Sequence, residues 1–294
     1  MAILLLDRGF HGYWRNAMIE ILLFPFEFEF MRKAFIISLV ISVPASLFSC
    51  FLILKGWALM GDAISHAVLP GIALAYIFGV PLFFGAFCAG IFCALSSGFL
   101  SQNSRLKEDT VMGIVFSGLF GLGLILSTAV KTEMHLDHIL FGNILGISLL
   151  DIFITGSIAI LVTVILILKQ SDFLLHSFDP VQAQIAGLNK RVLNYGLLVM
   201  LALTIVSTLS SVGIILSIGL LITPGAIAFL ITKQFKIMML IALFVTLISS
   251  FFGVYLSFFI DSAPAPTIIL ILSVIFIFVF LFAQIKDLVI TKTL

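Results

Sequence analysis

The stretch Gly61-Asp62-Ala63-Ile64-Ser65-His66-Ala67-Val68-Leu69-Pro70-Gly71 places two ionisable side chains inside a run that is otherwise apolar enough to cross a bilayer. Asp62 and His66 are four residues apart, so on an α-helix they share one face and lie one turn apart. Ionisable groups at membrane depth are costly and usually serve a function. A carboxylate and an imidazole together suit a first-row divalent metal. The stretch therefore predicts a metal-contacting site within a membrane-spanning helix.

The composition indicates an all-α polytopic membrane protein. Of the 294 residues, 62% are hydrophobic and 10% are charged, whereas soluble domains average about 45–50% and about 25%. At about 20 residues per span, the length allows eight or nine transmembrane helices and no sizeable soluble domain. The long unbroken apolar runs disfavour a transmembrane β-barrel, whose strands show short alternating segments.

The apolar runs divide the chain into three parts. Residues 1–33 are too polar to span and are predicted to form an N-terminal segment at the membrane interface. Residues 34–286 hold the spans, and residues 287–294 form a short cytoplasmic tail. The spans are expected at residues 34–54, 57–78, 82–100, 111–130, 149–168, 192–209, 211–232, 238–260 and 267–283.

The distribution of Lys and Arg predicts the orientation of these spans. The loops after the third, fifth and seventh spans are basic, holding Arg105 and Lys107, Lys190 and Arg191, and Lys233 and Lys236. Because such loops stay in the cytoplasm, the C-terminus is expected inside and, with nine spans, the N-terminus outside. The basic residues of the N-terminal segment argue for the opposite: Arg8, Arg15, Arg32 and Lys33.

The predicted site lies deep in its span. His66 is about 13 Å along the helix axis from the interfacial residue Trp57, near the middle of a hydrocarbon core about 30 Å thick. Transporters commonly bind substrate near this depth. Pro70-Gly71 and, in the seventh span, Pro224-Gly225 can break a helix that lines the pathway or allow close helix packing. The alternative is that Asp62 bonds a neighbouring helix and His66 is a buried structural histidine.

A second signal lies in the polar interval between the fifth and sixth spans. Ser177-Phe178-Asp179-Pro180 is typical of a helix start, because Ser or Asp can cap a helix and Pro is tolerated in its first turn. Ala183 continues the helix, which is expected to stop before Gly187. A short cytoplasmic helix of this kind suits docking on an ATPase; an ordinary surface helix is the alternative.

A third candidate is the outer segment between the fourth and fifth spans. Glu133, His135, Asp137 and His138 place two carboxylates and two imidazoles within six residues. They are a possible metal-entry site at the outer mouth. The segment could equally contact a binding protein or be a solvated loop.

Together these motifs resemble the permease subunit of the metal-ion ABC importers, the ABC-3 family that carries manganese, iron and zinc. The resemblance rests on Gly61–Gly71, Ser177–Gly187 and Ser211–Ala226, in that order, and extends from about Glu20 to Lys286. It implies an ABC transporter in which two permease subunits, identical or different, join two cytoplasmic ATPases and an extracytoplasmic metal-binding protein. It further implies that Asp62 and His66 contact the ion in transit and that Ser177–Gly187 is the coupling helix.

The implied function is transport of a divalent metal into the cytoplasm across the bacterial inner membrane, with no permanently bound cofactor. The residues from His138 to Asn143 are closer to the iron and manganese branch than to the zinc branch. No enzyme activity is expected, because the chain lacks the G-x-x-x-x-G-K-[ST] phosphate loop and ATP would be hydrolysed by a separate subunit. The chain departs from the family at Gly225, where alanine is common, and little consequence is expected.

Two other functions accommodate an intramembrane Asp and His. An ion-coupled secondary metal transporter would need neither an ATPase nor the docking helix. An intramembrane enzyme would use the pair for proton transfer or hydrolysis, but no nucleophile-and-base motif and no H-E-x-x-H sequence stand out.

Overall fold

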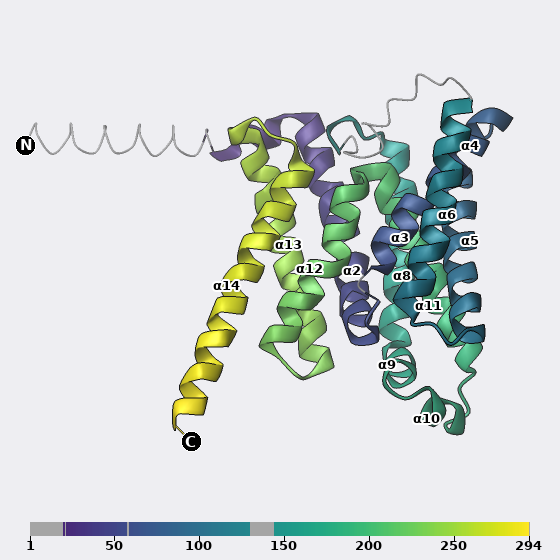
Figure 1. The fold of residues 1–294 in the computed structure, drawn as a ribbon. Coiled ribbons are helices and arrows are strands. Elements are labelled where there is room, and N and C mark those ends of the chain that lie inside the picture. Colours follow the sequence, from purple (N-terminus) through teal and green to yellow (C-terminus); the bar gives the residue numbers. More distant parts are fainter. Residues whose placement is uncertain (1–19, 21, 58, 130–143, 294) are drawn as a thin grey trace, which may run out of the picture.

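The computed structural model describes residues 20, 22–57, 59–129 and 144–293 (Figure 1). Every regular element within these residues is a helix, and nine segments are long and apolar enough to cross a membrane. The all-α polytopic class is therefore confirmed. In chain order the elements are η1 (Phe24–Glu27), α2 (Glu29–Lys55), α3 (Met60–Ala67), α4 (Leu69–Phe78), α5 (Leu82–Asn103), α6 (Glu108–Ala129), η2 (Ile144–Gly146), α8 (Leu149–Leu168), α9 (Gln170–Phe178), α10 (Pro180–Ile185), α11 (Lys190–Val212), α12 (Ile214–Ile231), α13 (Phe235–Ile260) and α14 (Pro264–Thr293).

The helices extend beyond the predicted spans mainly at their polar ends. α2 begins at Glu29 rather than Ala34, because Glu29 and Lys33 are one turn apart and form an ion pair of 2.8 Å on its first turns. α14 likewise continues past Ala283 to Thr293. A single residue, Gly213, separates α11 from α12, and its φ of +85° suits glycine.

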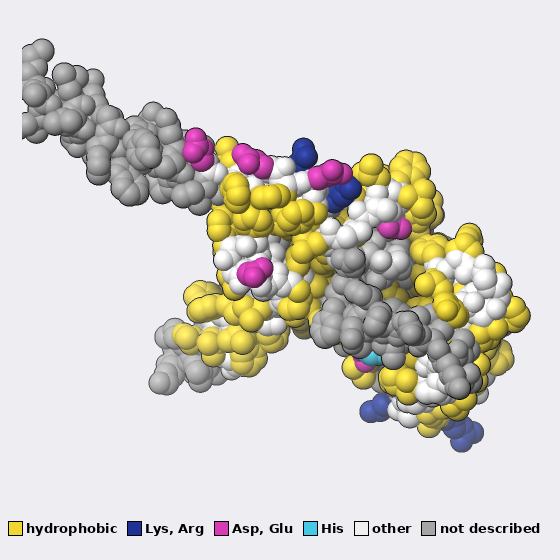
Figure 2. Space-filling view, turned by 90° about the horizontal axis from the view of Figure 1, so that it is seen from above, with side chains coloured by type: hydrophobic (Ala, Val, Ile, Leu, Met, Phe, Trp, Pro, Cys, Tyr) yellow, Lys and Arg dark blue, Asp and Glu magenta, His cyan; other side chains and the backbone are white. Residues whose placement is uncertain are grey.

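The two ends of the bundle differ in charge. The loops after α5, α10 and α12 lie at the end that carries α10 and the end of α14 (Figure 1), and they are the basic loops of the sequence. At the opposite end, Figure 2 shows acidic side chains intermixed with basic ones near the start of the chain's described part, where Glu27 and Glu29 are exposed and Lys33 pairs with Glu29. The start of α2 and the end of α14 lie at opposite ends of the bundle, as an odd number of crossings requires.

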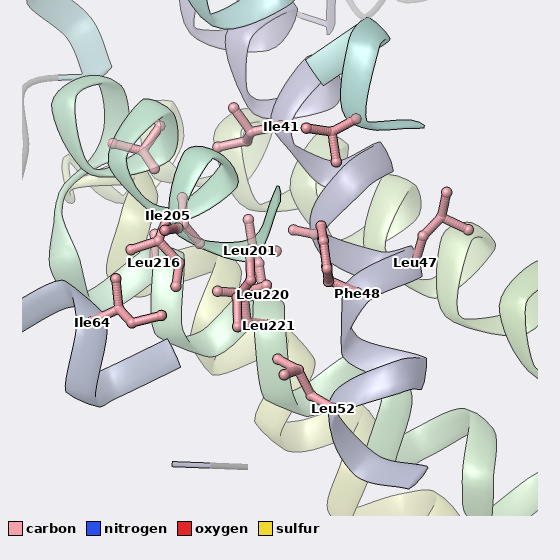
Figure 3. Packing of buried hydrophobic residues seen from close by; sticks show 14 of the residues in the cluster. Ile41, Leu47, Phe48, Leu52, Ile64, Leu201, Ile205, Leu216, Leu220 and Leu221 are labelled. Atoms are coloured by element: carbon pink, nitrogen blue, oxygen red, sulfur yellow. The ribbon is translucent and has the colours of Figure 1, made fainter. Parts of the chain in front are cut away.

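α2 is the central helix of the bundle, and it packs against α8, α12 and α13. Figure 3 shows Phe48 and Leu52 of α2 beside leucines of α12, among them Leu220 and Leu221. All four side chains are essentially inaccessible. Ile64 of α3 points into the same cluster (Figure 3). The short helix that carries the predicted site is thus anchored to the core.

α12 lacks one backbone hydrogen bond at Pro224, because proline has no N–H to donate to the Leu220 carbonyl. Ser49 of α2 compensates for the disturbed hydrogen bonding around it. Its Oγ accepts from the Gly225 N–H at 2.7 Å and donates to the Ile222 carbonyl at 3.0 Å. Backbone groups in a membrane must be satisfied within the protein, so this hydroxyl lets α12 continue as one helix through the proline.

α2 and α12 approach each other closely at Gly225. A Cβ on Gly225 would overlap the carbonyl and the side chain of Ser49. The expectation that glycine instead of alanine has little consequence here is therefore wrong for the packing of this chain. Close backbone contact is a main source of helix association in lipid, where hydrophobic burial drives association little.

We expect Gly225→Ala to lower the stability of the folded protein by about 1–3 kcal/mol, the usual cost of overpacking a dense core. The measurement is the midpoint of thermal unfolding in detergent. Gly113→Ala in α6 is the matched control, because a Cβ there meets nothing within 4 Å, and alanine favours a helix over glycine. Equal midpoints for the two variants would contradict the packing described at Ser49.

Candidate functional site

α3 is a short amphipathic helix with one face in the core. Met60, Ala63, Ile64 and Ala67 are buried at helical spacing. Asp62 and His66 lie on the other face. Figure 1 shows α3 at mid-height in the bundle, between α2 and α6.

The two predicted ligands lie together. His66 Nε2 is 3.3 Å from Asp62 Oδ1, and the two side chains remain 26% and 40% exposed. Among the described residues no hydrogen bond from a neighbouring helix reaches Asp62, which argues against a purely structural bond between helices. A carboxylate at this depth cannot face hydrocarbon without a large penalty, so its open side must face water or protein.

Two aromatic rings of α6 orient the imidazole. The His66 ring lies 5.7 Å from the Phe116 ring and 5.5 Å, edge to face, from the Phe120 ring. Phe116 and Phe120 are four residues apart and therefore share one face of α6. The sequence analysis did not select these phenylalanines, because nothing in the sequence pairs α6 with α3.

The helix is interrupted immediately after the Asp62–His66 pair. α3 ends at Ala67 and α4 begins at Leu69, and Pro70 has no N–H to donate to the His66 carbonyl. Gly71 has a different role, since a Cβ on either Gly71 or Gly85 would overlap the backbone carbonyl of the other. Pro70 thus interrupts the helix, whereas Gly71 packs α4 directly on α5.

The helix that carries the second predicted break, α12, packs against the start of α3. Gly61, next to Asp62, faces Leu221 of α12, whose Cδ1 would lie 3.3 Å from a Cβ on that glycine. The α12 segment that contains Pro224 and Gly225 therefore packs against the start of α3. Unlike Pro70, Pro224 remains inside a continuous helix.

The described residues supply only part of a metal coordination sphere. Within them, no group of three or more His, Cys, Asp and Glu side chains could hold an ion. Asp62 and His66 provide two ligands, whereas a divalent first-row metal takes about four to six. The predicted entry residues Glu133, His135, Asp137 and His138 lie outside the described residues.

The predicted docking helix is divided into α9 and α10 by Asp179. The Asp179 carboxylate accepts from the N–H groups of Val181 and Gln182, both at 2.9 Å, and Pro180 fills the first position of α10. Ser177 is not the cap, since it belongs to α9 and its hydroxyl donates to the Phe173 carbonyl at 2.7 Å.

The C-terminal end of α10 is fixed by a turn at Gly187. Gly187 adopts a φ of +80°, and the following N–H of Leu188 returns to the carbonyl of Ala183 at 3.0 Å. Ala183 is buried, but the apolar side chains of Phe178, Val181 and Ile185 are largely exposed. The end of α9 and α10 therefore present an apolar surface beyond the end of the bundle (Figure 1).

Comparison with known proteins places this arrangement in one family. The model of the ABC 3 transport family matches residues 27–283. The chain is 50% identical to a probable iron transport system membrane protein of Haemophilus influenzae, over 86% of this chain and 93% of that protein. It is 43% identical to the manganese transport system membrane protein MntC of Listeria innocua, over 90% of this chain and 95% of that one.

Solved structures agree with this assignment. PsaBC from Streptococcus pneumoniae in complex with Fab contains a chain that is 35% identical, with a TM-score of 0.78, covering 89% of this chain and 95% of that chain. A putative metal-chelate type ABC transporter in an inward-facing conformation shares the fold, with 16% identity, a TM-score of 0.63 and 85% of each chain covered. The chain therefore belongs to the ABC 3 transport family, as one of its multi-pass membrane permeases.

Proposed function

We propose that this permease moves a divalent transition metal, manganese or iron in preference to zinc, into the cytoplasm, with Asp62 and His66 as ligands in transit. The observation that carries the proposal is the Asp62–His66 pair itself. It is 3.3 Å apart and partly accessible, at mid-height in the bundle of a transport-family chain. Intramembrane ionisable residues of this kind mark ion pathways.

The choice of metal is supported by chemistry and by the relatives. Carboxylates suit Mn(II), and imidazole suits Fe(II) and Zn(II). Relatives with 50% and 43% identity are described as iron and manganese transport proteins. No resident cofactor is needed, because the metal is the substrate. A sparse ligand set also suits transport, since an ion that is held too tightly cannot leave.

A second permease subunit, identical or related, would complete the coordination sphere. One chain offers two ligands whose outer sides are open. A two-fold axis beside α3 would bring a second Asp–His pair to the same ion, and four ligands are enough for a transition metal. The open faces of Asp62 and His66 would then be covered by protein or pathway water instead of lipid.

Energy and substrate would come from partner proteins. A cytoplasmic ATPase dimer would bind the apolar surface formed by Phe178 at the end of α9 and by Val181 and Ile185 of α10, and would hydrolyse the ATP. The basic loops support a cytoplasmic position for this end of a permease in the bacterial inner membrane. An extracytoplasmic binding protein would deliver the metal at the opposite end, where Glu133, His135, Asp137 and His138 would receive it.

The function is tested by metal uptake in cells that lack other importers and express the permease with its ATPase and binding protein. Radiolabelled manganese and iron, each in competition with zinc, identify the substrate. Metal should also stimulate ATP turnover by the reconstituted complex. Uptake that survives loss of the ATPase would reject the ABC mechanism in favour of an ion-coupled carrier.

Asp62→Ala and His66→Ala are each expected to reduce metal uptake by roughly 10- to 100-fold or more, because disturbing even the outer shell of a metal site costs that much. Asp261→Asn is the matched control, since Asp261 is exposed just after α13, away from the site, and asparagine tolerates its left-handed φ of 55°. All variants should insert into the membrane at equal levels, as judged by immunoblotting. Normal uptake in both site variants would show that the pair is structural.

Asp179→Ala is expected to loosen α10, because losing a helix cap costs about 1 kcal/mol. Faster hydrogen exchange over residues 180–188 and weaker coupling of ATP turnover to uptake should follow. Asp179→Asn, which can still cap a helix, should behave like the wild type, whereas the charge reversal Asp179→Lys should uncouple the ATPase. If all three variants keep wild-type exchange and uptake, α10 does not transmit ATPase motion.

A further inference from the structure

A cavity of about 900 Å³ lies at the basic end of the bundle, away from the Asp62–His66 pair. The ends of α2 and α5, the α9–α10 junction and the start of α11 form its walls. Its volume is within the range that holds a ligand of drug or headgroup size.

The lining of this cavity is strongly positive. Lys55, Lys190 and Arg191 all contribute to it, and no Asp or Glu is among the described residues that line it. Lys190 and Arg191 occupy the first turn of α11, where the helix dipole disfavours cations and favours anions. Three cations around one space repel each other, and an anion between them would offset that repulsion. The arrangement therefore has an electrostatic reason to take up an anion.

Contacts within the protein hold one of these cations, Lys55, in place. The Lys55 amine lies 3.2 Å from Asn194 Oδ1 and 4.0 Å from the centre of the Trp57 ring. Asn194 is only 8% exposed, so it holds the lysine from within the protein. Arg191 adds a planar guanidinium, which matches phosphate oxygens in pairs. These side chains provide several donors in the lining of one cavity.

The location of the cavity indicates where the anion comes from. Trp57 and Lys55 lie where α2 leaves its apolar span, which is the level of the lipid headgroups. Leu54 and Phe99 add apolar walls beside the charged ones. Basic pockets between transmembrane helices on the cytoplasmic side are typical binding places for anionic headgroups.

We propose that this cavity binds the phosphate group of an anionic ligand, supplied by a phospholipid headgroup of the cytoplasmic leaflet or by free phosphate. The site is separate from the proposed metal pathway and does not depend on which metal is carried. Pro180, the first residue of α10, also lines it. An occupied cavity therefore stabilises the base of the docking helix.

The test uses the complete permease–ATPase complex in nanodiscs of phosphatidylcholine, with or without phosphatidylglycerol, and a third sample of phosphatidylcholine discs with inorganic phosphate. The readouts are the midpoint of thermal unfolding and the lipid retained in native mass spectrometry. The variant is Lys190→Gln/Arg191→Gln, whose side chains are exposed and outside the core. The matched control is Lys233→Gln/Lys236→Gln, which removes two exposed charges at the same end but outside the cavity.

Phosphatidylglycerol should stabilise the wild type and the control, and its binding to Lys190→Gln/Arg191→Gln should be about 30-fold weaker, about fivefold for each charge removed. High salt should reduce the effect. If inorganic phosphate gives the same variant-sensitive stabilisation and phosphatidylglycerol does not, free phosphate is the ligand. The proposal is overturned if neither anion stabilises the wild type, or if both double variants respond alike. It is also overturned if Lys190→Gln/Arg191→Gln releases the ATPase without changing anion binding, because the cavity is then a protein contact.

Discussion

The cost of an unsatisfied polar group in hydrocarbon is the constraint on which this structure depends. It is why the described chain crosses the membrane as helices, and why buried hydroxyls bond to carbonyls or to one another, as in the 2.7 Å contact between Ser42 and Ser250. It also explains Ser49, whose hydroxyl satisfies backbone groups around Pro224. Where the protein leaves polar groups open, at Asp62 and His66, the same constraint indicates a pathway.

The region around α3 combines a rigid support with a local break. Ile64 fixes one face of α3 to the core, and the Phe116 and Phe120 rings hold the imidazole from α6. Directly beyond the site, Pro70 leaves the His66 carbonyl without its helical hydrogen bond, where α3 gives way to α4. A transport site needs ligands that are held in place and a backbone that can change, and this segment provides both within a few residues.

The basic end of the bundle differs from the region around α3, because it presents surfaces to other molecules. There the exposed apolar surface of α10 and the positively charged cavity lie next to each other and share Pro180. One surface suits a protein and the other an anion, so under the proposed function the ATPase and the membrane would act on neighbouring residues at the start of α10. The Asp62–His66 pair lies elsewhere, on α3 at mid-height in the bundle.

The sequence alone predicted the all-α class, eight or nine spans and the pairing of Asp62 with His66, because apolar run length and helical periodicity are local properties. It also indicated a helix start near Asp179 from the capping chemistry alone. Four contacts became visible only in the tertiary structure. Phe116 and Phe120 pack on His66, and Ser49 hydrogen-bonds across the Pro224 break. Gly225 leaves no room for an alanine side chain, and Lys55 lines the same cavity as Lys190 and Arg191. These contacts join helices that are distant along the chain, and the apolar pattern of each helix does not specify its neighbours, since lipid and protein interior are equally apolar.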